Sequence, residues 1–214
     1  MQLPLDTRIA RHKTVGTWNE LKKSLVDFKN IVAWTSAYED YFLARLQDRY
    51  TEPIQAIQIS GNKKGEGFSM MAIICSLIEF LESTYQGRNY RYIEKGDKSL
   101  NLLSEYIKSS EIFISFLTQH KPFDSYFDKT KAKDFYKNVR CGLLHEARTI
   151  DKWIIKVLPS TKDLIEYNAT EKIIYRDNFF EAVNLFITEY KNDLLNSSDR
   201  KEAFIKKYDN LCNE

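Results

Sequence analysis

The chain has 214 residues, and its 32 basic and 30 acidic side chains give a net charge of +2, which provides no global footprint for nucleic acid. Its 43% hydrophobic content and few prolines and glycines exclude a disordered chain, and the length favours one sizeable domain. The longest apolar run, 70–81, is short of the roughly 20 residues that cross a bilayer, so no membrane association is expected. Scattered Cys75, Cys141 and Cys212 and the lack of an apolar leader predict a cytoplasmic protein with free thiols.

The N-terminal part of the chain predicts a helical region behind a polar lead-in. Residues 1–16 are expected to fray. Thr17 is predicted to cap a helix with Glu20 at the capping-box position. Apolar residues then recur at helical spacing over 18–46, which predicts one very long helix, or two in line, ending near Arg49.

A glycine-rich basic connector is predicted over 50–67, because Pro53 should block helix continuation. It leads into an apolar helix over 69–85. Such a loop before a helix N-terminus can hold an anion, with Lys63 and Lys64 as candidate ligands. The spacing does not match a Walker A motif, and a plain flexible connector is the alternative.

The stretch 88–95 interleaves basic and aromatic residues, so Arg88 and Arg91 are candidates for binding unpaired RNA bases and phosphates. The alternative is a solvated loop whose tyrosines pack partly on the core. Two short helices are predicted next, over 99–109 and 111–120.

After residue 150 the apolar period changes from that of a helix to that of a strand. Short β-branched and aromatic runs at 153–158, 164–167 and 172–175 predict a small antiparallel β-meander. Two amphipathic helices are predicted to follow, over 179–195 and 199–211.

The segment 135–147 predicts a buried helix that also carries an arginine and a histidine. At about 100° per residue, one apolar arc faces a core. That arc comprises Phe135, Tyr136, Val139, Leu143 and Ala147. Arg140 falls at its edge and His145 further round, beside Asn138 and Cys141, so Arg140 and His145 flank one strip of surface.

Arginine, four intervening residues and histidine near the end of an amphipathic helix resemble the signature of the HEPN superfamily. The resemblance implies a mainly α helical bundle, here a single domain over 1–214 with the β insertion at about 150–176. In that family the motif marks metal-independent ribonucleases of toxin–antitoxin and phage-defence systems, many of them bacterial, although many members are not catalytic. The family usually has a polar residue directly after the arginine, where this chain has Cys141.

The resemblance implies an RNA-cleaving site in which His145 transfers protons and Arg140 stabilises the phosphorane. Asn138, Cys141 and Glu146 are its expected supporting residues, and Lys63, Lys64, Arg88 and Arg91 its expected substrate-binding residues. The family's chemistry uses no metal or cofactor and yields a 2′,3′-cyclic phosphate. It implies a homodimer through the 135–147 helix, with RNA and an antitoxin or defence-system protein as further partners.

Several alternatives stay open from the sequence. Arg140 could bridge a buried carboxylate and His145 could be a half-buried structural histidine, as in a non-catalytic module that binds a protein or nucleic acid. Cys141 and His145 could ligate a metal, but no second ligand pair has a recognisable spacing. Gly142 is costly within a helix and is expected where a partner helix or a sugar–phosphate backbone approaches closely.

Overall fold

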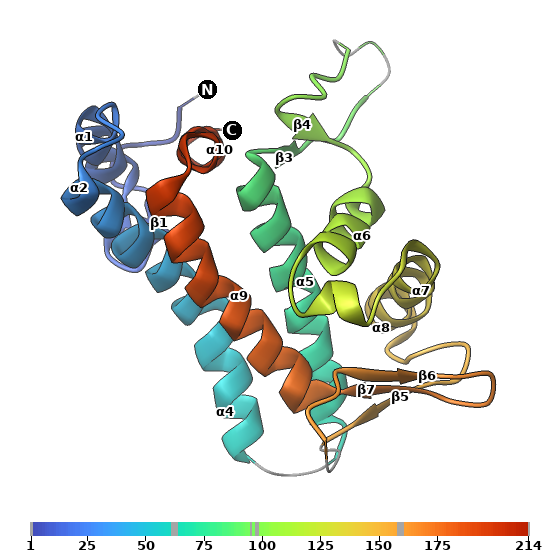
Figure 1. Ribbon diagram of the computed structural model, residues 1–214. Coiled ribbons are helices and arrows are strands. Elements are labelled where there is room, and N and C mark those ends of the chain that lie inside the picture. The colour runs from blue at the N-terminus through green and yellow to red at the C-terminus, as the bar shows by residue number, and fades with distance from the viewer. Residues whose placement is uncertain (1, 61–63, 95, 97–98, 158–160, 214) are drawn as a thin grey trace. The chain divides into compact units, whose positions relative to one another are not determined.

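The structure is a computed structural model that describes residues 2–60, 64–94, 96, 99–157 and 161–213. The chain folds into two compact units, and each unit is built from segments that are distant in sequence. Unit 1 comprises Met1–Glu52, Ser83–Lys108 and Ile187–Glu214, and unit 2 comprises Pro53–Glu82 and Ser109–Phe186. Both units are mainly helical, which confirms the predicted helical bundle (Figure 1). A single domain over residues 1–214 stays a prediction.

The N-terminal segment is ordered, so the prediction of a frayed lead-in is wrong. Strands β1 (Arg8–Ala10) and β2 (Lys13–Thr14) pair antiparallel. Ile9 and Ala10 are buried, and the Leu3 backbone N–H donates to the carbonyl oxygen of Cys212 at 2.9 Å. Apolar burial and this backbone bond hold a stretch whose composition is mostly polar.

Helix α1 (Val15–Leu25) begins two residues before the predicted cap. Thr14 is the N-cap, and its hydroxyl oxygen accepts from the backbone N–H of Thr17 at 3.3 Å. The Thr17 hydroxyl oxygen accepts in return from the backbone N–H of Thr14 at 2.8 Å. The capping box therefore pairs Thr14 with Thr17, and the predicted pairing of Thr17 with Glu20 is wrong.

A second helix runs without interruption through several segments, past the proline expected to end it. Pro53 lies in the first turn of its last segment. A π-helical turn just before this residue widens the backbone, which relieves the clash between the proline ring and the carbonyl four residues earlier. The predicted connector over 50–67 is therefore wrong up to Ser60. The segments are α2 (Ile31–Ser36), the π turn Ala37–Leu43, α3 (Ala44–Leu46), the π turn Gln47–Thr51 and α4 (Glu52–Ser60).

Unit 1 has an aromatic core between its N-terminal helices and α10 (Ser198–Leu211). Phe204 stacks on Tyr208 with ring centroids 4.4 Å apart, and the Trp18 ring lies 5.2 Å from that of Tyr208. The indole N–H of Trp18 donates to the Asp209 carboxylate at 2.9 Å, which satisfies its polar atom. Helix α9 (Arg176–Asn196) and α10 confirm the two predicted C-terminal helices.

The helix predicted over 99–109 is wrong. Strands β3 (Asn89–Tyr90) and β4 (Glu105–Tyr106) form a parallel pair, and 101–104 is a turn in which the Asn101 carbonyl accepts from the N–H groups of Ser104 and Glu105. Leu103 is 84% exposed. Helical spacing alone does not make a helix where no core covers its apolar face.

Helix α5 (Glu66–Gln86) confirms the predicted apolar core helix. By length and composition it is the one described helix that could cross a membrane. However, 61% of its most apolar window is buried in the protein, as in the core helix of a soluble protein.

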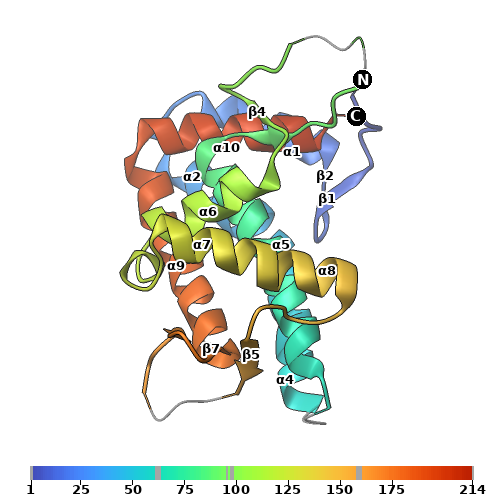
Figure 2. The same cartoon turned by 90° about the vertical axis from the view of Figure 1, so that its right-hand side faces the viewer.

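Unit 2 is organised around a second aromatic core. Phe135 stacks on Phe179 at 5.6 Å and lies 6.0 Å from Phe113 and 5.2 Å from Trp153, measured between ring centroids. Figure 2 shows α7 and α8 as one continuous rod that crosses α5. This rod, called the Arg–His helix below, consists of α7 (Lys129–Phe135), the π turn Tyr136–Cys141 and α8 (Gly142–Glu146). Helix α6 (Ser109–Gln119) and the 3-10 turn Phe123–Ser125 precede it.

The three strands predicted after this helix exist, but the antiparallel meander is wrong. The sheet order is β5 (Trp153–Lys156), β7 (Lys172–Tyr175), β6 (Ile165–Tyr167), with β7 parallel to β5 and antiparallel to β6. All four residues of β7 are buried, as expected of a central strand. Its pairing with both neighbours places β7 between the two strands that precede it in the chain.

Candidate functional site

The Arg–His helix begins at a strong cap and ends in a turn. The Asp128 carboxylate accepts from the backbone N–H groups of Thr130 and Lys131, both at 2.8 Å. The helix ends at Glu146, and its C-cap Ala147 has a left-handed conformation with a φ of 52°. Arg140 lies in the π turn and His145 in the last helical turn. π-Helical turns inside α-helices are frequent at functional sites.

The π turn changes which residues share a face. Each π-helical residue turns the chain by less than an α-helical one, so positions on either side are out of the expected phase. Asn138 is buried, whereas His145 is exposed, although their spacing predicts a shared face. The side-chain amide of Asn138 donates to the Asp134 carboxylate at 2.8 Å. The backbone carbonyl of Asn138 accepts from the backbone N–H of Ile150 at 2.8 Å. Asn138 therefore binds the loop that follows the helix and does not face the surface strip between Arg140 and His145.

Arg140 is held in place from two sides. Its Nη2 lies 3.3 Å from Oε2 of Glu79 on α5, and its guanidinium carbon lies 5.4 Å from the Tyr136 ring centroid. Burial lowers the pKa of Arg140, but Tyr136 and Glu79 raise it, and the net shift is upward. The side chain remains 19% exposed. A charged, oriented guanidinium thus reaches the surface of unit 2.

His145 lies one turn further along the same rod and is exposed. Its ring has no hydrogen bond or ion pair to any residue that the structure describes. Exposed Leu144 and Glu146 flank it, and half-buried Cys141 separates it from Arg140 along the helix. The imidazole can therefore take and give protons to a bound molecule without breaking a contact within the described chain.

Comparison with protein-family models, curated proteins and solved structures finds no match to this chain.

Gly142 makes room for the protein's own loop. A Cβ at this position would lie 2.6 Å from the carbonyl oxygen of Arg148 and 3.1 Å from Cγ1 of Ile150. The loop after the helix folds back over Gly142, which is buried. The expected approach of a partner helix or a sugar–phosphate backbone to Gly142 is therefore wrong.

The predicted substrate-binding residues that the structure describes belong to different units. Lys64 is exposed, and Lys63 lies outside the described residues. Arg88 and Arg91 belong to unit 1. Arg88 donates from Nε and Nη2 to the Glu105 carbonyl, and Arg91 pairs with the Glu105 carboxylate at 3.2 Å. Both arginines brace the β3–β4 pair.

Glu79 is the site residue that the sequence analysis missed. It is the one charged residue in the apolar run 70–81, and an unexplained charge in such a run signals a buried partner. No group of three or more His, Cys, Asp or Glu side chains within the described part of the chain is placed to hold a metal ion. Arg140, His145 and Glu79 supply a guanidinium, an imidazole and a carboxylate.

Proposed function

We propose that this chain is a metal-independent endoribonuclease of the HEPN type, with a toxin or phage-defence role in bacteria. The supporting observation is that one helix carries a fixed guanidinium, Arg140, and an accessible imidazole, His145. An arginine fork suits the non-bridging phosphate oxygens, and a histidine suits proton transfer near neutral pH.

The proposed reaction is an internal transfer at phosphorus. The 2′-oxygen of the ribose attacks the adjacent phosphorus, its proton passes to a base, and the bond from phosphorus to the 5′-oxygen breaks. A proton supplied to that oxygen gives a 5′-hydroxyl product beside the 2′,3′-cyclic phosphate. His145 acts in proton transfer, and Arg140 stabilises the negative charge of the phosphorane.

A single chain supplies half of this chemistry at the Arg–His helix. One imidazole cannot be the base and the acid of the same step, so the proposal includes a homodimer in which a second copy supplies the other histidine. Leu144, 53% exposed beside His145, offers an apolar contact for that interface. An antitoxin or defence-system protein that covers the same strip would restrain cleavage.

Glu79 has a defined part in this proposal. Its carboxylate orients Arg140, and it must give way or share the guanidinium when phosphate binds. Glu79→Gln keeps the shape and removes the negative charge. We expect it to lower the KM for RNA.

The test is cleavage of mixed RNA by the full chain in EDTA, followed by analysis of the new ends. We expect wild type to form 2′,3′-cyclic phosphates and His145→Ala to lose at least about a hundredfold in rate, as for a general acid or base. His12→Ala is the matched control, because His12 is also exposed but lies in unit 1. Equal cleavage by His145→Ala, or cleavage of RNA with 2′-deoxy substitutions, would refute the proposal.

The Arg140–Glu79 pair favours a second candidate, a non-catalytic HEPN-like module that binds a protein or nucleic acid. A largely buried ion pair can be purely structural. In that case wild type cleaves no RNA, Arg140→Met lowers thermal stability, and His145→Ala weakens capture of RNA or of a partner protein without affecting stability.

A further inference from the structure

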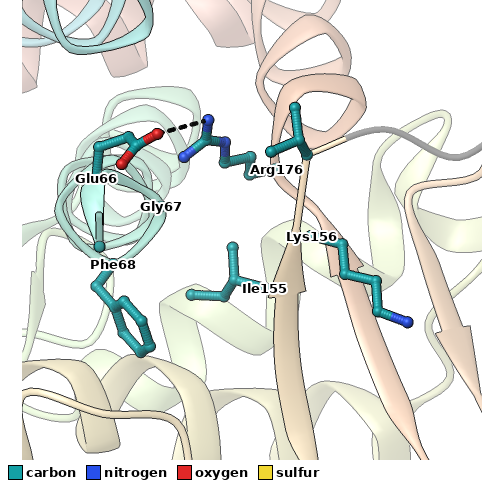
Figure 3. A pocket seen from close by; sticks show the side chains of 8 residues that line it. Glu66, Gly67, Phe68, Ile155, Lys156 and Arg176 are labelled. Carbon is teal, nitrogen blue, oxygen red and sulfur yellow. Dashed lines mark hydrogen bonds and ion pairs between the residues drawn. The ribbon is translucent and has the colours of Figure 1, made fainter. Parts of the chain in front are cut away.

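A cavity of about 180 Å³ lies within unit 2, away from the contacts that hold Arg140. Its lining comes from the first turn of α5, the end of β5 and the first residue of α9 (Figure 3). This volume is below the roughly 300 Å³ at which drug-sized ligand sites begin. The cavity therefore suits a single small ring system and not an extended molecule.

A buried ion pair forms the polar side of the cavity. Arg176 is only 7% exposed, and its Nη2 lies 3.4 Å from Oε1 of Glu66. A dashed line marks this pair in Figure 3. Nε of Arg176 and Oε2 of Glu66 are both buried, and neither has a well-aligned hydrogen bond to a described residue. The nearest charge to that Nε is the Asp177 carboxylate at 3.6 Å. A buried donor and a buried acceptor thus line one small cavity.

The remaining walls are apolar. Phe68 is 40% exposed at the rim, and Ile155 lies across the cavity from the start of α5. A Cβ on Gly67 would come within 3.0 Å of Cγ2 of Ile155 and 3.2 Å of Nη1 of Arg176, so glycine keeps this side open. The Lys156 amine points away from the cavity in Figure 3. The lining therefore combines an aromatic ring with a carboxylate–guanidinium pair.

We propose that this cavity binds a guanine base, with Glu66 and Arg176 reading its edge and Phe68 packing against its ring. Guanine carries adjacent N1–H and N2–H donors for a carboxylate, and O6 beside them is an acceptor for a guanidinium. Adenine places an unprotonated ring nitrogen where the carboxylate needs a donor. A free phosphate is disfavoured, because the Glu66 carboxylate lines the same cavity and would repel it.

The choice of a nucleobase as ligand rests on the proposed action on RNA, with the cavity as a base-specific subsite. Unpaired bases are commonly bound by stacking on aromatic rings and by hydrogen bonds to their edges. The inference predicts that RNA binding by this chain favours guanosine at one position.

The test is calorimetric titration of 5′-GMP, AMP, CMP and UMP into the full chain carrying His145→Ala, which separates binding from cleavage. We expect GMP to bind most tightly, and Phe68→Ala and Glu66→Gln each to raise its Kd about tenfold. Ile154→Ala is the matched control, because Ile154 is exposed on β5 and does not line the cavity. Phe68 is a rim residue, so its loss leaves the buried ion pair intact.

No heat with GMP at millimolar concentration, equal affinity for all four nucleotides, or an unchanged Kd in both variants would overturn the inference. Cleavage by the wild type without GMP binding would remove the subsite and leave the proposed ribonuclease standing. GMP binding that meets these criteria, in a protein that cleaves no RNA, would support the guanine-binding cavity and refute the proposed ribonuclease.

Discussion

A methyl group added at Gly142 measures how closely the following loop packs on the Arg–His helix. In an open helix, alanine in place of glycine stabilises by about 1 kcal/mol. At Gly142 the new Cβ would lie 2.6 Å from the Arg148 carbonyl oxygen, which belongs to the backbone and has no rotamer to change. The loop itself must therefore move.

The cost of that movement outweighs the helical gain. Overpacking of this kind costs about 1–3 kcal/mol. Displacing the loop also strains the bond from Ile150 N–H to the Asn138 carbonyl, and such a bond contributes about 1 kcal/mol. Against a gain of about 1 kcal/mol, we expect Gly142→Ala to lower the free energy of unfolding by about 1–3 kcal/mol.

Urea denaturation followed by tryptophan fluorescence measures this difference. Ser76→Ala is the control, because Ser76 is exposed in the middle of α5 and should gain a few tenths of a kcal/mol from propensity, at most about 0.5. A Gly142→Ala protein as stable as wild type, or more stable, would show that the loop does not press on Gly142.

Three further predictions address the core, the ion-pair network and the strip. Phe135→Ala should cost about 3–5 kcal/mol in thermal or urea unfolding, because it empties the centre of the aromatic core. Burial raises the pKa of Asp134, but the hydrogen bond from Lys172 and other groups lower it overall. The stability that this carboxylate contributes is fully present above the ordinary aspartate pKa near 3.9. It is lost as the pH falls through the lower pKa of Asp134 in the folded protein. Lys172→Met should therefore cost about 3 kcal/mol at pH 7 and less near pH 3, by urea titration at both pH values. Iodoacetamide should modify half-buried Cys141 before buried Cys75, whose pKa burial raises to about 12, and mass spectrometry of the folded protein would show the order.

Strong local patterns predicted the helices whose apolar face meets a core. The helices near 69–85, 111–120, 179–195 and 199–211 are present. The helix over 99–109 failed because Leu102 and Leu103 there face solvent, at 70% and 84% exposed, and periodicity does not report whether a core exists. The helix past Pro53 was missed because a π turn, which spacing does not reveal, accommodates the ring.

The sequence by itself determined which residues are candidates for chemistry, since Arg140 and His145 are identified by type and spacing on one helix. Only the tertiary structure decided their surroundings. Glu79 comes from a helix about sixty residues earlier, and neither the Glu66–Arg176 pair nor the central place of β7 follows from local periodicity. Local sequence fixes backbone preference and side-chain chemistry, whereas contacts between distant segments depend on how whole elements bury their surfaces.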